Sequence, residues 1–178
     1  MALKFEASEW INASPNIVYG FATNLDLAGK WMPNFVRMEK LTPGAFGPGT
    51  RFRETRKMFG KTATELFEVL STEPPRRFVL GVDGTQGSSK RGHYEFAYEL
   101  LPESDGTRVL LTGTISKLSW FGRGIGRLFL GKIKRICAAD LEALKQYIEN
   151  QSASLRHTTA MMVAFTPPNP VKALPNDE

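Results

Sequence analysis

Residues 51–69 read RFRETRKMFGKTATELFEV, and the spacing of charged, aromatic and turn-forming residues in this stretch predicts a β-hairpin. Phe59-Gly60 provides the turn, because glycine adopts the backbone conformations that tight turns need. A tight loop with an even number of residues, centred there, determines which residues of the two strands lie opposite each other. The predicted cross-strand pairs are Arg56 with Ala63, Glu54 with Glu65, and Phe52 with Phe67.

The two faces of this hairpin differ in character. Successive side chains of a strand point to opposite sides, and one side of the hairpin is almost wholly polar, so we expect it to face water. The other side carries the three pairs above together with Val69, and we expect it to face the interior. Charged residues are uncommon at interior positions. Glu54, Arg56 and Glu65 are therefore the first candidates for a functional site.

The rest of the chain divides into strands and helices by the same reasoning. Ser14 and Pro15 are typical of a helix N-cap and first helical position, and Asn24 can cap a second short helix that Pro33 ends. Turn-forming residues separate the remaining runs of alternating hydrophobicity. We expect strands at 4–12, 35–41, 50–58, 61–70, 78–83, 91–101 and 107–117, a short helix at 15–23 followed by one after Asn24, and a long helix at 124–149.

This order of elements predicts an α+β fold. Seven strands form an antiparallel sheet, two short helices follow the first strand, and the long C-terminal helix lies across the concave face. We expect one domain over residues 3–150. Residues 151–178 contain several prolines and no sustained period, so we expect a tail or packing arm there.

Composition excludes several classes of protein. The chain has 178 residues, of which 42% are hydrophobic and 23% are charged, as in an ordinary globular domain. A single cysteine, Cys137, cannot form an internal disulfide, and two histidines make a zinc site unexpected. No apolar run approaches the roughly 20 residues of a membrane span. We also expect no signal peptide, and hence a cytoplasmic location.

Four segments of the chain carry a resemblance to a known family: FEASEWINASPNIVYGFATNLD (5–26), WMPNFVRMEKLTPG (31–44), GPGTRFRE (47–54) and DGTRVLLTG (105–113). They resemble the START-like (SRPBCC) superfamily, and most closely its polyketide cyclase/dehydrase branch. The resemblance covers about residues 3–150. It implies a helix-grip fold, in which a curved seven-stranded sheet encloses an apolar ligand cavity around the C-terminal helix. It implies no particular reaction, since the superfamily contains both lipid carriers and ring-closing enzymes.

Aromatic and aliphatic residues dominate the predicted inner surface. Tyr94, Phe96 and Tyr98 share one face of their strand, and the long helix carries apolar residues at spacings of three and four. The expected ligand-binding residues are Trp31, Phe35, Phe52, Phe67, Tyr94, Phe96, Tyr98, Leu111, Phe129, Ile133, Ile136 and Asp140.

Asp140 is the exception in the apolar stripe of the long helix. A carboxylate buried there costs several kcal/mol unless it is paired. We expect it to be a satisfied partner of Arg56 or of a tyrosine rather than a catalyst.

The candidate catalytic residues Glu54, Glu65 and Arg56 have two interpretations. Two carboxylates beside one arginine should differ in pKa, and one that keeps its proton in an apolar cavity can act as a general acid or base. The alternative is a structural ion-pair network, or a cluster at a wet cavity mouth. The sequence leaves both open.

Basic residues cluster at 51–61 and 123–135, and the formal net charge is +5. No nucleic-acid motif accompanies them, so we expect a solvated surface and no nucleic-acid partner. The start of the long helix, with Arg123, Arg127, Lys132, Lys134 and Arg135 beside Trp120, could make weak contact with an anionic membrane.

Three hypotheses of function follow. The first is binding of a small hydrophobic molecule (a lipid, polyketide or aromatic metabolite) in an internal cavity. The second is a cyclase or dehydratase that uses the carboxylate pair for proton transfer. The third is a module that binds a protein or a membrane surface through its basic face. No cofactor is expected under any of them, and the sequence predicts no particular oligomeric state.

Overall fold

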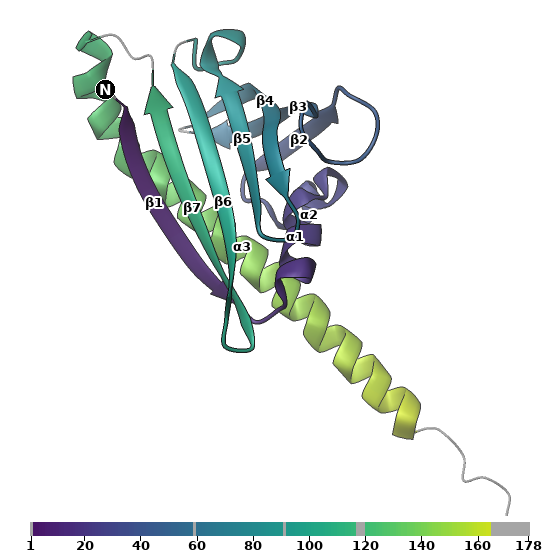
Figure 1. Cartoon of the computed structure of the whole chain (residues 1–178). Helices are drawn as coiled ribbons and strands as arrows, with labels where there is room; N and C mark the ends of the chain where they lie inside the picture. Colours follow the sequence, from purple (N-terminus) through teal and green to yellow (C-terminus); the bar gives the residue numbers. More distant parts are fainter. Residues whose placement is uncertain (1, 59, 91, 117–119, 165–178) are drawn as a thin grey trace, which may run out of the picture.

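The computed structural model describes residues 2–58, 60–90, 92–116 and 120–164, with side chains described for all of these except 120–129 and 155–164. Strands and short helices precede one long helix (Figure 1). The elements are β1 (Leu3–Ile11), α1 (Pro15–Thr23), the 3-10 helix η1 (Leu25–Leu27), α2 (Ala28–Trp31), β2 (Phe35–Lys40), β3 (Arg51–Met58), β4 (Lys61–Glu73), β5 (Arg77–Asp83), the 3-10 helix η2 (Gly84–Gln86), β6 (His93–Glu103), β7 (Gly106–Ser116) and α3 (Trp120–Ala164).

All seven strands belong to one antiparallel sheet, in the order β1-β7-β6-β5-β4-β3-β2. The sheet curves around α3 (Figure 1), and the predicted α+β helix-grip architecture is confirmed. Because β1 and β2 lie at opposite edges, the chain between them must cross from one edge of the sheet to the other. The short helices α1, η1 and α2 make that crossing.

The register predicted for the hairpin of β3 and β4 is confirmed. Arg56 pairs with Ala63, Glu54 with Glu65, and Phe52 with Phe67. On the opposite, outward face, the hydroxyl groups of Thr55 and Thr64 lie 2.9 Å apart. The alternation of the hairpin sequence therefore places its charged and aromatic members on the concave side of the sheet.

The predicted capping residues at the short helices have different outcomes. Ser14 occupies the N-cap position and Pro15 begins α1, as predicted, but the side chain of Ser14 makes no capping hydrogen bond. Asn24 does cap, since its side-chain oxygen accepts a hydrogen bond from the backbone N–H of Asp26 at 3.1 Å. The chain then leaves α2 at Met32, just before Pro33.

The C-terminal helix is longer than predicted at both ends. It extends over Trp120–Ala164 instead of 124–149, so residues 151–164, expected to be a tail or packing arm, are helical. No proline or glycine occurs between Gly131 and Pro167. The regular spacing of apolar residues stops after residue 149, but the helix continues, because no helix-breaking residue follows until Pro167. The remainder of the expected tail, residues 165–178, lies outside the described residues.

The hydrophobic core lies where α3 and α1 cover the inner face of β1, β6 and β7. Its fully buried side chains include Ile11, Val18, Leu100, Leu111 and Ile148. Gly113 is required for this packing, because a Cβ atom there would lie 2.1 Å from the ring of Phe5.

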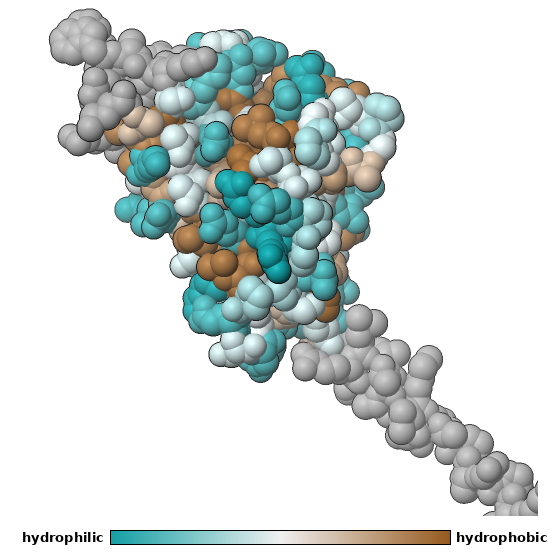
Figure 2. Space-filling view, viewed as in Figure 1, coloured by the Kyte–Doolittle hydropathy of each residue, from teal (hydrophilic) through white to brown (hydrophobic). Residues whose placement is uncertain are grey.

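The surface seen in Figure 2 carries hydrophobic side chains in small groups separated by hydrophilic ones. Exposed large hydrophobic residues include Leu70 and Leu101. No helix in the described part of the chain is both long enough and apolar enough to cross a membrane.

A buried ion pair joins the helix to the sheet. The Arg56 guanidinium on β3 donates to both carboxylate oxygens of Asp140 on α3, at 2.8 and 2.6 Å. It also donates to the carbonyl of Pro33, through Nη2 at 2.8 Å and Nε at 3.3 Å. Arg56 was one of the partners expected for Asp140. One side chain thus fixes α3 and the α2–β2 connection relative to β3.

We expect Asp140→Asn to lower the free energy of unfolding by about 3 kcal/mol, because it leaves the buried Arg56 charge without a carboxylate. Urea denaturation followed by circular dichroism measures this loss.

The matched control is Glu103→Gln. Glu103 forms an equally short two-point ion pair with Arg108, at 2.8 and 2.7 Å, but on the surface. Because water and salt screen exposed pairs, this variant should lose far less stability than Asp140→Asn. Equal losses in the two variants would contradict a structural role for the buried pair.

Candidate functional site

A cavity of about 550 Å³ lies between the concave face of the sheet and α3. That volume falls in the range of pockets for small organic molecules. Helix α3 contributes Ile133, Ile136, Cys137, Asp140, Leu141 and Leu144 to its wall. Aromatic rings form much of the rest, namely Trp31, Phe46, Phe52, Phe67, Phe78, Tyr94, Phe96 and Tyr98.

Several of these rings pack against one another in two groups that form an aromatic wall. The cross-strand pair Phe52 and Phe67 lies with ring centroids 5.2 Å apart and planes only 4° from parallel. Phe67 continues to Phe96 at 6.4 Å. Phe78 and Tyr98 form a second stack, at 4.4 Å and 13°. These flat surfaces suit flat, apolar ligand groups.

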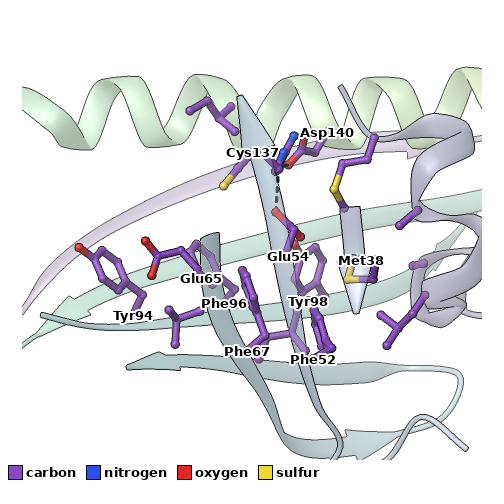
Figure 3. A pocket seen from close by; sticks show the side chains of 18 of the residues that line it. Met38, Phe52, Glu54, Glu65, Phe67, Tyr94, Phe96, Tyr98, Cys137 and Asp140 are labelled. Atoms are coloured by element: carbon purple, nitrogen blue, oxygen red, sulfur yellow. Dashed lines mark hydrogen bonds and ion pairs between the residues drawn. The ribbon is translucent and has the colours of Figure 1, made fainter. Parts of the chain in front are cut away.

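The main polar cluster of the cavity surrounds Arg56. Glu54 lies two residues earlier on β3, with Oε1 3.6 Å from Arg56 Nη1. Figure 3 shows Glu54, Tyr98, Cys137 and Asp140 gathered in this part of the cavity. They come from β3, β6 and α3, so only the folded chain brings them together.

The carboxyl of Glu54 titrates near neutral pH. Burial raises the pKa of Glu54 to about 7, although the positive charge of Arg56 opposes the shift. The negative charges of Asp140 and Glu65 add to the rise. At physiological pH this carboxyl therefore exists in both protonated and ionised forms.

The pKa values of the neighbours of Glu54 are shifted as well. Burial raises the pKa of Tyr98 well above its ordinary value, and raises the pKa of Cys137 to about 12. Burial alone would lower the pKa of Arg56, but hydrogen bonds and charge from Asp140 outweigh it and raise the pKa. Burial raises the pKa of Asp140 from its ordinary value, with Arg56 opposing the shift.

Glu65 lies opposite Glu54 in the sheet but has different partners. Its Oε1 accepts hydrogen bonds from the backbone N–H of Ser89 at 2.8 Å and from the Ser89 hydroxyl at 2.7 Å. Its carboxylate lies so close to Gly87 that a side chain there would collide with it. In Figure 3 the carboxylate of Glu65 turns towards Tyr94, away from that of Glu54. Glu65 thus holds the loop between β5 and β6 against β4.

Most of the residues predicted to form the site do line this cavity. They are Glu54, Arg56, Glu65, Trp31, Phe52, Phe67, Tyr94, Phe96, Tyr98, Ile133, Ile136 and Asp140.

Leu111 and Phe35 are not among the lining residues. Leu111 is fully buried, because at its position on β7 the core side chains of α1 and α3 cover the sheet. The ring of Phe35 packs on Gly29, where a Cβ atom would lie 2.9 Å from it. Phe129, Arg123 and Arg127 lie outside the residues whose side chains are described, so the expected membrane contact remains a prediction.

Sequence reasoning missed several lining residues. Phe78, Leu80 and Val82 alternate along β5, and the rule applied to the other strands would have found them. Phe46 and Ser89 lie in loops rich in turn-forming residues, where no period reveals which side chains turn inward. Within the described part of the chain, no group of three or more potential ligand side chains could hold a metal ion.

The fold of the chain matches several solved structures. It is similar to TTHA0849 from Thermus thermophilus, with a TM-score of 0.69 and 24% identity over 84% of this chain and 99% of that one. It is also similar to the Zhui aromatase/cyclase from a Streptomyces species, with a TM-score of 0.71 and 16% identity over 85% of this chain and 96% of that one. At these identities, the likeness establishes the fold alone.

Sequence comparison identifies the family. No curated protein matches the chain at a significant level. The model of the family described as polyketide cyclase / dehydrase and lipid transport matches residues 2–149, which include the whole sheet and α3 as far as Glu149. The chain therefore belongs to the polyketide cyclase / dehydrase and lipid transport family.

Proposed function

We propose that this protein binds one small, largely apolar molecule in the cavity, with the polar end of the ligand beside Glu54 and Tyr98. The observation that supports this most directly is a cavity of about 550 Å³ with an aromatic wall and a compact polar cluster around Arg56. Pockets for small molecules combine these two features, since apolar walls supply affinity and a few polar groups set orientation.

The stacked rings account for most of the expected affinity. When a ligand covers a ring, apolar surface is removed from water. This contributes a binding free energy of about 25 cal/mol per Å² of surface buried. Phe67 lies between Phe52 and Phe96 in this wall, so a ligand in the cavity should contact it. Flat polycyclic or polyketide-like molecules fit such a wall better than branched ones.

Native mass spectrometry of freshly purified protein tests the proposal directly. We expect an apolar molecule bound with a stoichiometry of one, released by solvent extraction. A ligand-free mass, together with no binding of any apolar fluorophore, would contradict it.

We expect Phe67→Ala to weaken binding of an apolar fluorophore such as 2-acetylanthracene by about tenfold, from the loss of roughly 1.5 kcal/mol of buried ring contact. Fluorescence titration measures the change. The control is Leu66→Ala. Leu66 immediately precedes Phe67 on β4 but lies on the outer face of the sheet. It should bind within twofold of the original protein, and equal losses in the two variants would argue against binding in this cavity.

A second candidate function is proton transfer by Glu54. A carboxyl whose pKa is about 7 can donate or accept a proton at physiological pH, as enolisation of a carbonyl requires. The Tyr98 hydroxyl keeps its proton and lies in the same cluster, where it could donate a hydrogen bond to a developing enolate. Under this proposal Arg56 positions Asp140 and stabilises the ionised form of Glu54.

A Kemp elimination of 5-nitrobenzisoxazole would report the basicity of this carboxyl. The ionised carboxylate removes the ring C–H proton, and the N–O bond breaks to give a nitrile and a phenolate. Because only ionised Glu54 is a base, the rate should rise as pH increases through about 7 and level off above it.

Glu54→Gln should lower that rate at least a hundredfold at pH 8. Glu68→Gln removes an equal charge from the outer face of the same hairpin and should leave the rate unchanged. If the rate of the Glu54→Gln variant still rose with pH through about 7, the base would be another residue.

A further inference from the structure

We infer that the cavity selects ligands with an uncharged, hydrogen-bond-accepting end, such as a ketone, over ligands with an anionic end, such as a carboxylate or phosphate. This inference rests on the proposed binding function and names the class of ligand. It follows from how Arg56 is bonded and from which other charges line the cavity.

Most of the hydrogen-bonding capacity of Arg56 is already used within the protein. A guanidinium has five N–H donors. Four of them meet acceptors in this structure: two are directed at Asp140 and two at the carbonyl of Pro33. The closest further acceptor is Glu54, 3.6 Å from Nη1. An anionic ligand could therefore reach at most one N–H of this cation, on Nη1 beside Glu54, without breaking the buried ion pair.

The other ionisable groups of the cavity are unfavourable to an anion. Among the described lining residues, Arg56 is the only basic one, whereas Glu54, Glu65 and Asp140 are acidic. Arg56 balances the charge of Asp140. A ligand carboxylate would therefore lie near additional negative charge in a poorly solvated space, where such repulsion is strong.

An uncharged acceptor meets a complementary arrangement instead. The Tyr98 hydroxyl is a donor, and protonated Glu54 is a second donor in the same cluster. A ketone oxygen could accept from either without placing a new charge in the cavity. The aromatic wall would hold the apolar remainder of the same molecule.

Two fluorescent probes of nearly equal shape test this selectivity. 2-Acetylanthracene carries a ketone where anthracene-2-carboxylate carries an anion, and their ring systems are identical. We expect the ketone to bind at least tenfold more tightly than the carboxylate at pH 8, in fluorescence titrations of protein freed of co-purified molecules. We also expect ketone affinity to fall as pH rises through about 7, since Glu54 then loses its donor proton.

Two variants assign the selectivity to the cavity. Glu54→Gln keeps a donor but removes the charge, so the ratio of ketone to carboxylate affinity at pH 8 should narrow several-fold. Glu68→Gln removes a charge of the same sign from the outer face of the sheet and should leave the ratio unchanged. If the affinity ratio narrowed equally in both variants, the selectivity would come from the overall charge of the protein, and the inference would be overturned.

The outcomes separate this inference from the proposed function. Equal affinities for the two probes, or tighter binding of the carboxylate, would overturn the selectivity and leave ligand binding intact. Binding of neither probe, together with a ligand-free native mass, would overturn the proposed function itself.

Discussion

The buried charge of Arg56 is the constraint on which the arrangement of sheet and helix depends. A guanidinium inside a protein must have its donors satisfied, because the cost of burying it unpaired is several kcal/mol. Its partners come from α3 and from the connection between α2 and β2. Satisfying one side chain therefore determines where two other parts of the chain lie relative to β3.

That constraint also maintains the cavity. A helix packed on a sheet by apolar side chains alone would approach until the space between them was filled. Near β1 and β7 this happens, and Ile148 of α3 is fully buried there. Near β3 the contact is instead made by two long polar side chains, Arg56 and Asp140, which meet across the gap. The helix is thus packed tightly at one edge of the sheet and held at a distance at the other.

The same ion pair limits how far Arg56 can offset the effect of burial on the pKa of Glu54. Arg56 would stabilise an ionised Glu54 fully if it had no other partner. Since Asp140 already balances the guanidinium charge, Glu54 receives only part of that stabilisation, and burial raises its pKa to about 7. Burial raises the pKa of Glu54, and because Arg56 is already paired with Asp140 it opposes that rise only in part, so Glu54 can change its protonation state near physiological pH.

Much of this could be predicted from the sequence, wherever a local rule determines the outcome. The Phe59-Gly60 turn and period-two alternation were sufficient for the register of β3 and β4, and hence for the inward positions of Glu54, Arg56 and Phe67. The partner of Asp140 was predictable because a carboxylate in an apolar stripe needs a cation, and few cations were predicted to face inward. The same rules failed at Leu111, because alternation identifies the inner face without distinguishing the part under the helix from the part that lines the cavity.

The two glutamates show where sequence reasoning ends. Glu54 and Glu65 are the same residue type, directly opposite on neighbouring strands and facing the same way, so no local rule distinguishes them. The difference comes from segments distant in the chain. The loop between β5 and β6 gives Glu65 two donors from Ser89, whereas Glu54 lies beside an arginine already bonded to α3. Strand register determines which carboxyls enter the cavity, but tertiary partners determine which of them remains able to exchange a proton.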